Sequence, residues 1–388
     1  MKIIEREDEL TNLKNKLSVT PIVAILGPRQ CGKTTLAHQF ADKQHKEEVH
    51  FFDLENPADL AKLENPTLTL EELTGFVIID EIQRKSELFP VLRYLVDKQK
   101  KKTKYIILGS ASRELVNKSS ESLAGRISFL ELGGFSLEEV GAKLHKLLWL
   151  RGGFPESFFL RTEEMSYEWR QNFITTFLER DIPNLGIQIP PQMLRRFWLM
   201  LSHYHGQIFN ASEIGRSLNI SDTTAKRYLD TLSGTFVIRQ LQPWYYNTSK
   251  RLVKRPKIYF RDSGIFHTLL SIKNSKDLAA NPKLGASWEG FALEQAIKAL
   301  NLRQEESFFW AVHTGGEIDL IFQKKGKLFG IEFKYNEAPK MTPSMKSALD
   351  ELSLEKIYVI YPGKENYELH KKITVLSIEN IGALSNLS

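Results

Sequence analysis

The chain has 388 residues, which is enough for two or three domains. Its hydrophobic share of 42% and its charged share of 26% are typical of a soluble globular protein. The net charge of +6 permits a nucleic-acid partner, but a solvated basic surface explains it equally well. The charged start has no apolar signal core, no apolar run approaches the roughly 20 residues that span a bilayer, and the single cysteine excludes an internal disulfide. We therefore expect a cytoplasmic protein without a membrane partner.

Residues 20–40 combine an apolar strand, a glycine-rich loop and the start of a helix. The loop at 27–34 has the GxxxxGK[ST] spacing of a phosphate-binding loop, with the preceding strand and following helix that this motif requires. Its backbone N–H groups and the helix N-terminus would hold the β-phosphate of ATP, with Lys33 on the β- and γ-phosphate oxygens and Thr34 on Mg²⁺. An ordinary glycine turn is the alternative. The residues expected to bind the nucleotide are Gly27, Pro28, Arg29, Gln30, Cys31, Gly32, Lys33, Thr34 and Thr35.

Cys31, the only cysteine, lies inside this loop. Two interpretations stay open: a small filler side chain, or a thiol whose pKa is depressed at a helix N-terminus. In the second case an alkylating agent would block nucleotide binding, and bound nucleotide would protect the thiol.

Two acids end the next expected strand, over residues 75–81. Four apolar residues precede Asp80 and Glu81, as in a buried parallel strand whose carboxyl end lies where open α/β sheets bind ligands. We expect Asp80 to hold Mg²⁺ through water, and Glu81 to orient and deprotonate the attacking water. An acidic strand end without a role is the alternative.

Two further positions follow this strand. The strand expected over 104–110 ends at Ser110, and Ser110 or Ser112 would contact the γ-phosphate or the attacking water, unless Ser110 is only a turn residue. Arg126 precedes the strand expected over 127–132. It is either a surface ion-pair residue or an arginine finger that completes the site of a neighbouring subunit in a homo-oligomer.

Several segments in combination resemble a known protein group. They are GPRQCGKTT at 27–35, FDLE at 52–55, IDEIQ at 79–83, GS at 109–110, LAGR at 123–126, RGGFPE at 151–156 and ERDI at 179–182. Together they are similar to AAA-type ATPases joined to a C-terminal DUF4143 region, over nearly the whole chain. The resemblance implies an N-terminal P-loop domain of the ASCE class and the use of ATP, but no pathway.

The middle of the chain is expected to be helical, and then to form a winged helix-turn-helix. Residues 136–205 carry apolar side chains at helical spacing and are expected to form a lid on the ATPase domain. Two short helices over 210–218 and 222–232, with Ser221 as N-cap between them, precede a strand that begins at residue 236.

This segment has two open interpretations. If it binds DNA, the second helix would place Thr223, Thr224, Lys226 and Arg227 in the groove. Six basic residues between positions 250 and 261 support such a contact electrostatically. The alternative is a packing module that reuses the fold.

The C-terminal region follows the order helix, three strands, helix and strand, over residues 285–363. Lys325 and Gly326 are typical of a two-residue hairpin turn. With that turn, Asp319 opposes Glu332 and Glu317 opposes the lysine at position 334. Strict alternation would place these four side chains on one face of the sheet. The opposite face would carry Ile318, Leu320, Phe322, Phe329, Ile331 and Phe333.

Directly opposed carboxylates repel each other, and a divalent cation is the simple way to offset that repulsion. We expect Asp319, Glu332 and Glu289 to bind Mg²⁺ or Mn²⁺, with Lys334 stabilising a developing phosphorane charge. This set is similar to the PD-(D/E)xK nuclease signature, to which DUF4143 regions are often related. Glu317 departs from that pattern, because it could pair with Lys334. A surface hairpin without a metal, or a nuclease-like fold kept for binding, is the alternative.

The sequence thus predicts an α/β protein of four parts. They are a P-loop ATPase domain at 1–135, a helical lid at 136–205, a winged-helix segment at 206–245 and a nuclease-like α/β domain at 246–388. The expected reaction is Mg²⁺-dependent hydrolysis of ATP by Lys33, Thr34, Asp80 and Glu81. Two uses of that reaction stay open: an ATP-linked nuclease acting on DNA, and a nucleotide-gated switch that binds a partner without cleaving it.

Overall fold

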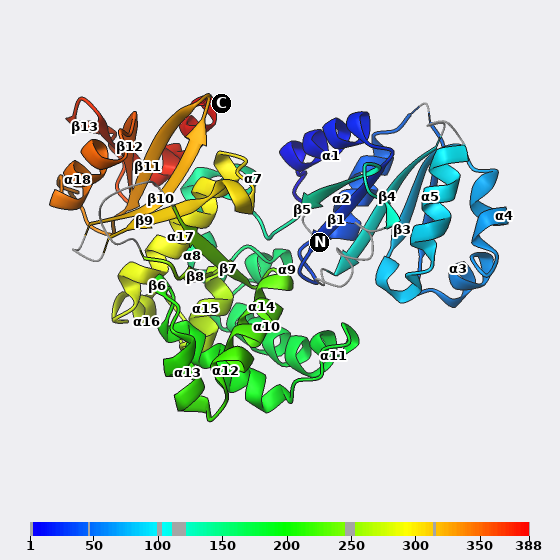
Figure 1. The fold of residues 1–388 in the computed structure, drawn as a ribbon, viewed down its shortest axis with the longest axis horizontal. Helices are drawn as coiled ribbons and strands as arrows, with labels where there is room; N and C mark the ends of the chain where they lie inside the picture. Colours follow the sequence, from blue (N-terminus) through cyan, green and yellow to red (C-terminus); the bar gives the residue numbers. More distant parts are fainter. Residues whose placement is uncertain are drawn as a thin grey trace. The chain divides into compact units, whose positions relative to one another are not determined.

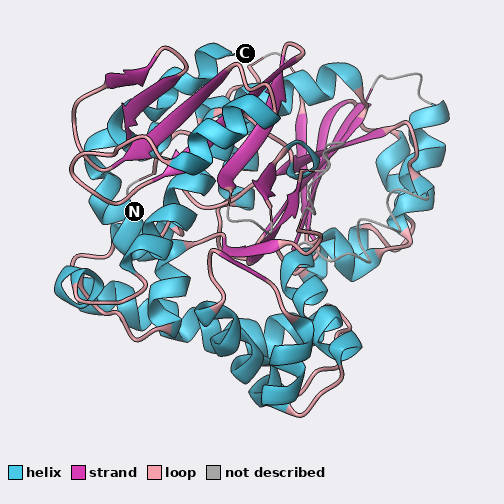
Figure 2. Cartoon of the chain, turned by 60° about the vertical axis from the view of Figure 1, so that its left-hand side comes forward, coloured by secondary structure: helices cyan, strands magenta, loops and turns pink. Residues whose placement is uncertain are grey.

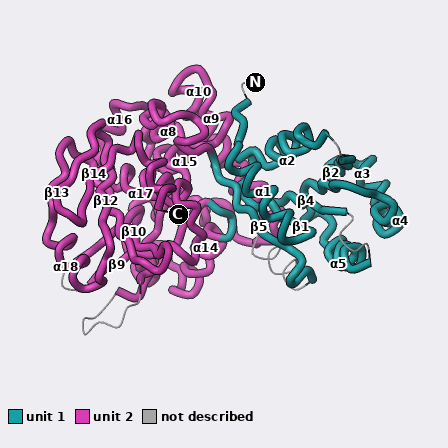
Figure 3. Tube along the Cα trace, turned by 90° about the horizontal axis from the view of Figure 1, so that it is seen from above, with its two compact units in different colours: residues 1–134, 234–236 teal, residues 135–233, 237–388 magenta. Residues whose placement is uncertain are grey.

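The computed structural model describes residues 3–45, 47–98, 103–110, 122–244, 253–312 and 316–387. The chain forms two compact units (Figure 3). The first consists of residues 1–134 and 234–236, and the second of residues 135–233 and 237–388. No helix in the described ranges has both the length and the apolar sequence that crossing a membrane requires.

The first unit is built on a parallel five-stranded sheet in the order β2-β3-β4-β1-β5 (Figure 1). The strands are β1 (Ile22–Gly27), β2 (Val49–Asp53), β3 (Gly75–Asp80), β4 (Thr103–Ser110) and β5 (Ile127–Glu131). Because all five run in one direction, their carboxyl ends meet at one edge. There Gly27 pairs with Ser110, and Asp53 pairs with Asp80.

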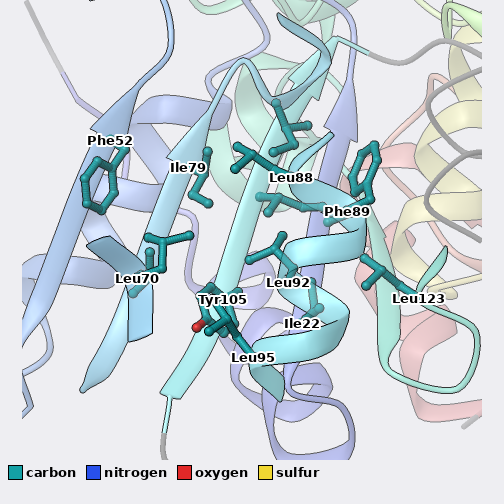
Figure 4. Close-up of a cluster of buried hydrophobic side chains, with 14 of the residues drawn as sticks. Ile22, Phe52, Leu70, Ile79, Leu88, Phe89, Leu92, Leu95, Tyr105 and Leu123 are labelled. Carbon is teal, nitrogen blue, oxygen red and sulfur yellow. The ribbon is translucent and has the colours of Figure 1, made fainter. Parts of the chain in front are cut away.

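Helices cover both faces of this sheet (Figure 1). They are α1 (Glu7–Val19), α2 (Lys33–Asp42), α3 (Pro57–Lys62), α4 (Pro66–Glu71), the 3₁₀ turn η1 (Ile82–Lys85) and α5 (Leu88–Lys98). Leu88, Leu92 and Leu95 recur on α5 at helical spacing and pack on alternate residues of the strands, such as Ile22 and Ile79 (Figure 4). This core holds the strand ends in place at the sheet edge.

Residues 135–233 belong to the second unit and are mainly helical, as the sequence predicts for 136–205. The helices are α7 (Leu137–Val140), η2 (Ala142–Leu144), α8 (His145–Arg151), α9 (Pro155–Phe159), α10 (Glu163–Thr176), a π-helical turn η3 (Phe177–Asp181), α11 (Ile182–Asn184), α12 (Pro191–His203), α13 (Ala211–Leu218) and α14 (Asp222–Gly234). The expected lid therefore packs into the same unit as the C-terminal sheet.

The second unit also contains a mixed nine-stranded sheet (Figure 2). Its order is β13-β14-β12-β11-β10-β9-β7-β8-β6. The strands are β6 (Gln207–Ile208), β7 (Ile238–Pro243), β8 (Lys257–Phe260), β9 (Phe308–Ala311), β10 (Glu317–Lys324), β11 (Lys327–Phe333), β12 (Lys356–Tyr361), β13 (Tyr367–His370) and β14 (Ile373–Ser377). The remaining helices are α15 (Ser263–Leu269), α16 (Ser275–Ala279), α17 (Leu284–Ala299), η4 (Gln304–Glu306), α18 (Pro343–Glu351) and η5 (Ile378–Leu387).

The expected boundary between 206–245 and 246–388 falls inside this sheet. Strand β7 pairs antiparallel with β8 and parallel with β9, so the strands of the winged helix continue into the C-terminal strands. The two predicted parts thus share one hydrogen-bonded framework.

The β10–β11 hairpin has the predicted register. Lys325 and Gly326 both have positive φ, as a two-residue type I′ turn requires. Leu320 pairs with Ile331, and Phe322 pairs with Phe329. The prediction of strict alternation along β10 was wrong, however. A bulge against β9 between Ile318 and Ile321 lets both side chains enter the same core cluster under α18.

Candidate nucleotide site

The glycine-rich loop joins the end of β1 to the start of α2. Gln30 and Gly32 have positive φ, and Gly32 is the N-cap of α2. A Cβ atom on Gly27 would lie 2.1 Å from the carbonyl oxygen of Leu132, so only glycine fits there without displacing the backbone. Leu132 in turn donates its N–H to the carbonyl of Leu26 at 2.7 Å. The loop is thus packed closely against the segment that follows β5.

Lys33 extends back over this loop. Its buried ammonium donates to the carbonyl oxygens of Gly27, at 3.0 Å, and Pro28, at 2.9 Å. The side chains of Thr34 and Thr35 beside it are exposed. A buried ammonium in the loop, next to two solvent-exposed threonine side chains, is suited to bind an anionic ligand such as a phosphate group.

Thr34 and Asp80 meet at the edge of the sheet, as the sequence predicts. The Thr34 hydroxyl donates to Oδ2 of Asp80 at 2.7 Å, and Oδ1 accepts the N–H of Glu81 at 2.8 Å. A hydroxyl and a carboxylate are the oxygen ligands that Mg²⁺ prefers. These two side chains therefore fit the metal that an ATP site needs.

Glu81 follows Asp80 in a left-handed backbone conformation, with φ of 55° and ψ of 43°. Such a conformation is unfavourable for a residue other than glycine and is typical of functional turns. Its carboxylate accepts a hydrogen bond from the Gln83 side chain, and Nη2 of Arg29 lies 3.9 Å from its Oε1. Burial raises the pKa of Glu81, while the positive charges of Lys33 and Arg29 oppose that rise. A carboxylate with a raised pKa is suited to accept a proton from water.

The other predicted residues of this unit are placed differently. Cys31 is fully buried, and its thiol donates to the carbonyl of Leu132 at 3.4 Å, which agrees with the filler interpretation. Ser110 ends β4 next to Gly27, at the same edge as the loop, and Ser112 lies outside the described residues.

Arg126 precedes β5 at the opposite edge, where its guanidinium binds both carboxylate oxygens of Asp97 at 2.7 and 3.0 Å.

Arg6 is a contributor that sequence reasoning missed. Only 3% of its surface is exposed, and its guanidinium donates to the carbonyls of Cys31 at 3.2 Å, Gly133 at 3.1 Å and Gly134 at 3.3 Å. It therefore ties the phosphate loop to the segment after β5. A lone arginine in a charged N-terminal stretch gives no sequence signal for this role.

At the site where the sequence predicts a metal in the second unit, a buried lysine ammonium lies between the acidic side chains. Lys257, at the start of β8, is 2% exposed and places its Nζ 3.5 Å from Oε1 of Glu289 and 3.5 Å from Oδ1 of Asp319. It also forms an ion pair with Glu317. Glu317 therefore pairs with Lys257 rather than with Lys334, which instead binds Glu332 at 2.5 Å.

The prediction of a second metal bound by Glu289, Asp319 and Glu332 was wrong. Within the part of the chain that the structure describes, no three His, Cys, Asp or Glu side chains are arranged to hold a metal ion. The ammonium of Lys257 supplies the positive charge that the metal was expected to supply. Burial raises the pKa of Glu289 to about 7 and that of Glu332 to about 8, and the charge of Asp319 adds to both shifts.

Helices α13 and α14 form the predicted helix-turn-helix. Asn219 ends α13 in a left-handed conformation, and Ser221 accepts the N–H of Thr224 at 3.1 Å, which confirms it as the N-cap. Of the residues expected to face DNA, Thr223, Lys226 and Arg227 are exposed and Thr224 is half-buried. Lys254 and Arg255 are exposed as well. Two other residues of the basic stretch bind acidic side chains of the protein instead. Lys257 lies in the buried cluster, and Arg261 forms an ion pair with Glu294 at 3.7 Å.

Comparison with known proteins identifies three consecutive regions. Residues 19–141 match a family model described as an AAA domain, and residues 142–276 and 284–381 match the domains of unknown function DUF8612 and DUF4143. The uncharacterized protein Rv2008c of Mycobacterium tuberculosis is 46% identical over 379 residues, which cover 98% of this chain and 85% of that protein. The uncharacterized protein Mb2031c of Mycobacterium bovis matches equally well. The chain belongs to this family of AAA-type proteins.

The AAA domain and the DUF4143 region that the sequence predicts are thereby confirmed. Among solved structures, the Walker-type ATPase PABY2304 of Pyrococcus abyssi is similar with a TM-score of 0.48 and 16% identity, over 69% of this chain and 96% of that one. A likeness of that size adds nothing to the family assignment. The loop, Thr34, Asp80 and Glu81 all lie within the matched AAA domain.

Proposed function

We propose that this AAA-type protein hydrolyses ATP by direct attack of water on the γ-phosphorus. The observation that carries the proposal is the 2.7 Å hydrogen bond between Thr34 and Asp80, formed beside a lysine-bearing phosphate loop and next to Glu81. This arrangement supplies phosphate binding, metal ligands and a base at one edge of the sheet, which phosphoryl transfer to water requires.

Each of these residues has a distinct task in the proposed reaction. Thr34 and Asp80 would hold Mg²⁺, which would supply positive charge to offset the negative charge of the phosphates. Lys33 exchanges its two loop carbonyls for phosphate oxygens, and Glu81 accepts a proton from the attacking water. The water oxygen bonds to the γ-phosphorus as the bond to the β–γ bridging oxygen breaks, and the electron pair stays on ADP. The buried position of Glu81 raises its pKa and so makes it a stronger base.

Phosphate release and nucleotide binding should be measured on the full chain with Mg²⁺. Lys33→Ala should lose ATP binding and turnover together. Glu81→Gln should keep ATP binding and lose roughly 100-fold or more in turnover. Glu72→Gln, an exposed carboxylate at the end of α4, serves as the matched control and should behave as the wild type. Turnover that survives in Lys33→Ala would refute the assignment.

The helix-turn-helix supports a second function, contact with duplex DNA. The exposed side of α14 carries Lys226 and Arg227 next to the exposed Thr223, while Ala225 and Leu229 face the core. Basic and hydroxyl side chains on a second helix are suited to phosphates and base edges in a major groove. We propose binding rather than cleavage, because Lys257 takes the place of the metal that cleavage would need.

DNA contact is tested by fluorescence anisotropy with a labelled duplex at two salt concentrations. The double variant Lys226→Ala, Arg227→Ala should bind more weakly and show a smaller salt dependence than the wild type. Lys276→Ala, an exposed change on α16, is the control. Equal binding by the double variant and the wild type would leave α14 as a packing element.

A further inference from the structure

Arg29 joins two carboxylates at the nucleotide site of the first unit. It is the third residue of the phosphate loop, and its Nη2 lies 3.1 Å from Oε1 of Glu55 and 3.9 Å from Oε1 of Glu81. Oε1 of Glu55 is also 3.4 Å from Nη1 of Arg84. The Arg29 side chain is 22% exposed, so water and a ligand can reach it.

The position of Glu81 locates Arg29 relative to the reacting atoms. If Glu81 takes the proton of the attacking water, that water lies within hydrogen-bonding distance of its carboxylate. The γ-phosphorus is the next atom along the path of attack. A guanidinium about 4 Å from the same carboxylate, on the loop that binds the phosphates, is therefore within reach of the γ-phosphate oxygens.

We propose that Arg29 is a catalytic residue that exchanges Glu55 for the γ-phosphate when ATP binds. The proposal rests on ATP hydrolysis as the function of this site. A γ-phosphate carries more negative charge than a carboxylate, and a guanidinium can bind it through two parallel hydrogen bonds. Partner exchange is thus favoured by ATP and not by ADP, which has no γ-phosphate.

Arg126 cannot serve the same nucleotide, because it binds Asp97 at the opposite edge of the sheet.

The test compares ATP with ADP in variants of the full chain. Arg29→Ala should lower ATP turnover by roughly 100-fold or more. Its affinity for ADP should stay within about threefold of the wild type, which also reports that the loop has folded. Arg29→Lys keeps the charge without the paired hydrogen bonds and should recover part of the turnover. Glu55→Gln removes the ion pair between Glu55 and Arg29 and should tighten ATP binding without changing ADP binding.

Arg93→Ala, an exposed change on α5, is the control and should leave ATP turnover, ATP affinity and ADP affinity unchanged. Turnover by Arg29→Ala within about threefold of the wild type would overturn the proposal. So would an equal loss of ATP and ADP affinity, which would make Arg29 a structural part of the loop. If the wild type does not hydrolyse ATP, the proposed function fails. Arg29 is still tested in that case, because Arg29→Ala must weaken ATP binding more than ADP binding.

Discussion

The ammonium nitrogen of Lys257 lies 3.5 Å from a carboxylate oxygen of Asp319, inside the sheet of the second unit. The same nitrogen is 3.5 Å from Glu289 and pairs with Glu317. Three acids thus share one buried cation, which comes from a strand of the winged helix. The lysine links that strand electrostatically to α17 and β10.

Removal of this cation should destabilise the second unit strongly. Lys257→Met removes the ammonium that lies 3.5 Å from both Asp319 and Glu289, and the loss of unfolding free energy should be about 3–5 kcal/mol. Adding Asp319→Asn to this variant should restore part of the lost unfolding free energy, because one of the buried negative charges is then absent. Urea unfolding followed by circular dichroism measures both changes.

A surface lysine provides the comparison for this experiment. Lys327 pairs with Glu355 at 2.8 Å, with both side chains exposed, and Lys327→Met should change stability little. If Lys257→Met is as mild as Lys327→Met, the cluster is not held by the buried ammonium.

The raised pKa values of Glu289 and Glu332 predict how stability depends on pH. Burial moves them from an ordinary value of 4.5 to about 7 and about 8. Between pH 4.5 and about 8 the native state therefore binds more protons than the unfolded state. Because the unfolding free energy then decreases as pH rises, these two groups stabilise the protein most on the acid side of this window.

Glutamine at either position removes the titrating group. Glu289→Gln and Glu332→Gln should each flatten the decline of the melting temperature across the window, and the double variant should flatten it further. Glu337→Gln, at an exposed carboxylate, should leave the slope unchanged. A slope that is identical in all four variants would contradict the assignment.

The accuracy of the sequence-based predictions depended on how local each feature is. The phosphate loop is contiguous, and parallel strands bring their carboxyl ends to one edge, so the meeting of Thr34 with Asp80 could be predicted from two short segments. The hairpin register followed from a two-residue turn and is equally local.

The contacts that sequence reasoning missed join distant segments. Lys257 is 60 positions from Glu317, and it lies in a basic stretch that supports DNA contact as one of two open interpretations of the sequence. Arg6 reaches carbonyl groups as far away as Gly134, 128 positions on. Neither a motif nor a periodicity marks such partners, because only the tertiary fold brings them together.

Cys31 should be unreactive in the native protein. Its thiol is fully buried and bonded to Leu132, and Arg6 holds its carbonyl group. N-ethylmaleimide should therefore modify it only in urea, as measured by mass spectrometry. Cys31→Ala should bind ATP like the wild type. Rapid modification of the native protein, accompanied by loss of ATP binding and prevented by ATP, would instead support a reactive thiol in the loop.

Arg126 should not contribute to ATP turnover. It lies at the edge of the sheet opposite the phosphate loop, where its half-buried side chain binds Asp97. Arg126→Ala and Asp97→Asn should therefore both keep the wild-type turnover and change the melting temperature little. An arginine finger for a neighbouring subunit would behave differently, because turnover would then fall in Arg126→Ala alone. Mixing that variant with Lys33→Ala would restore activity, since one variant would supply the arginine and the other the intact loop.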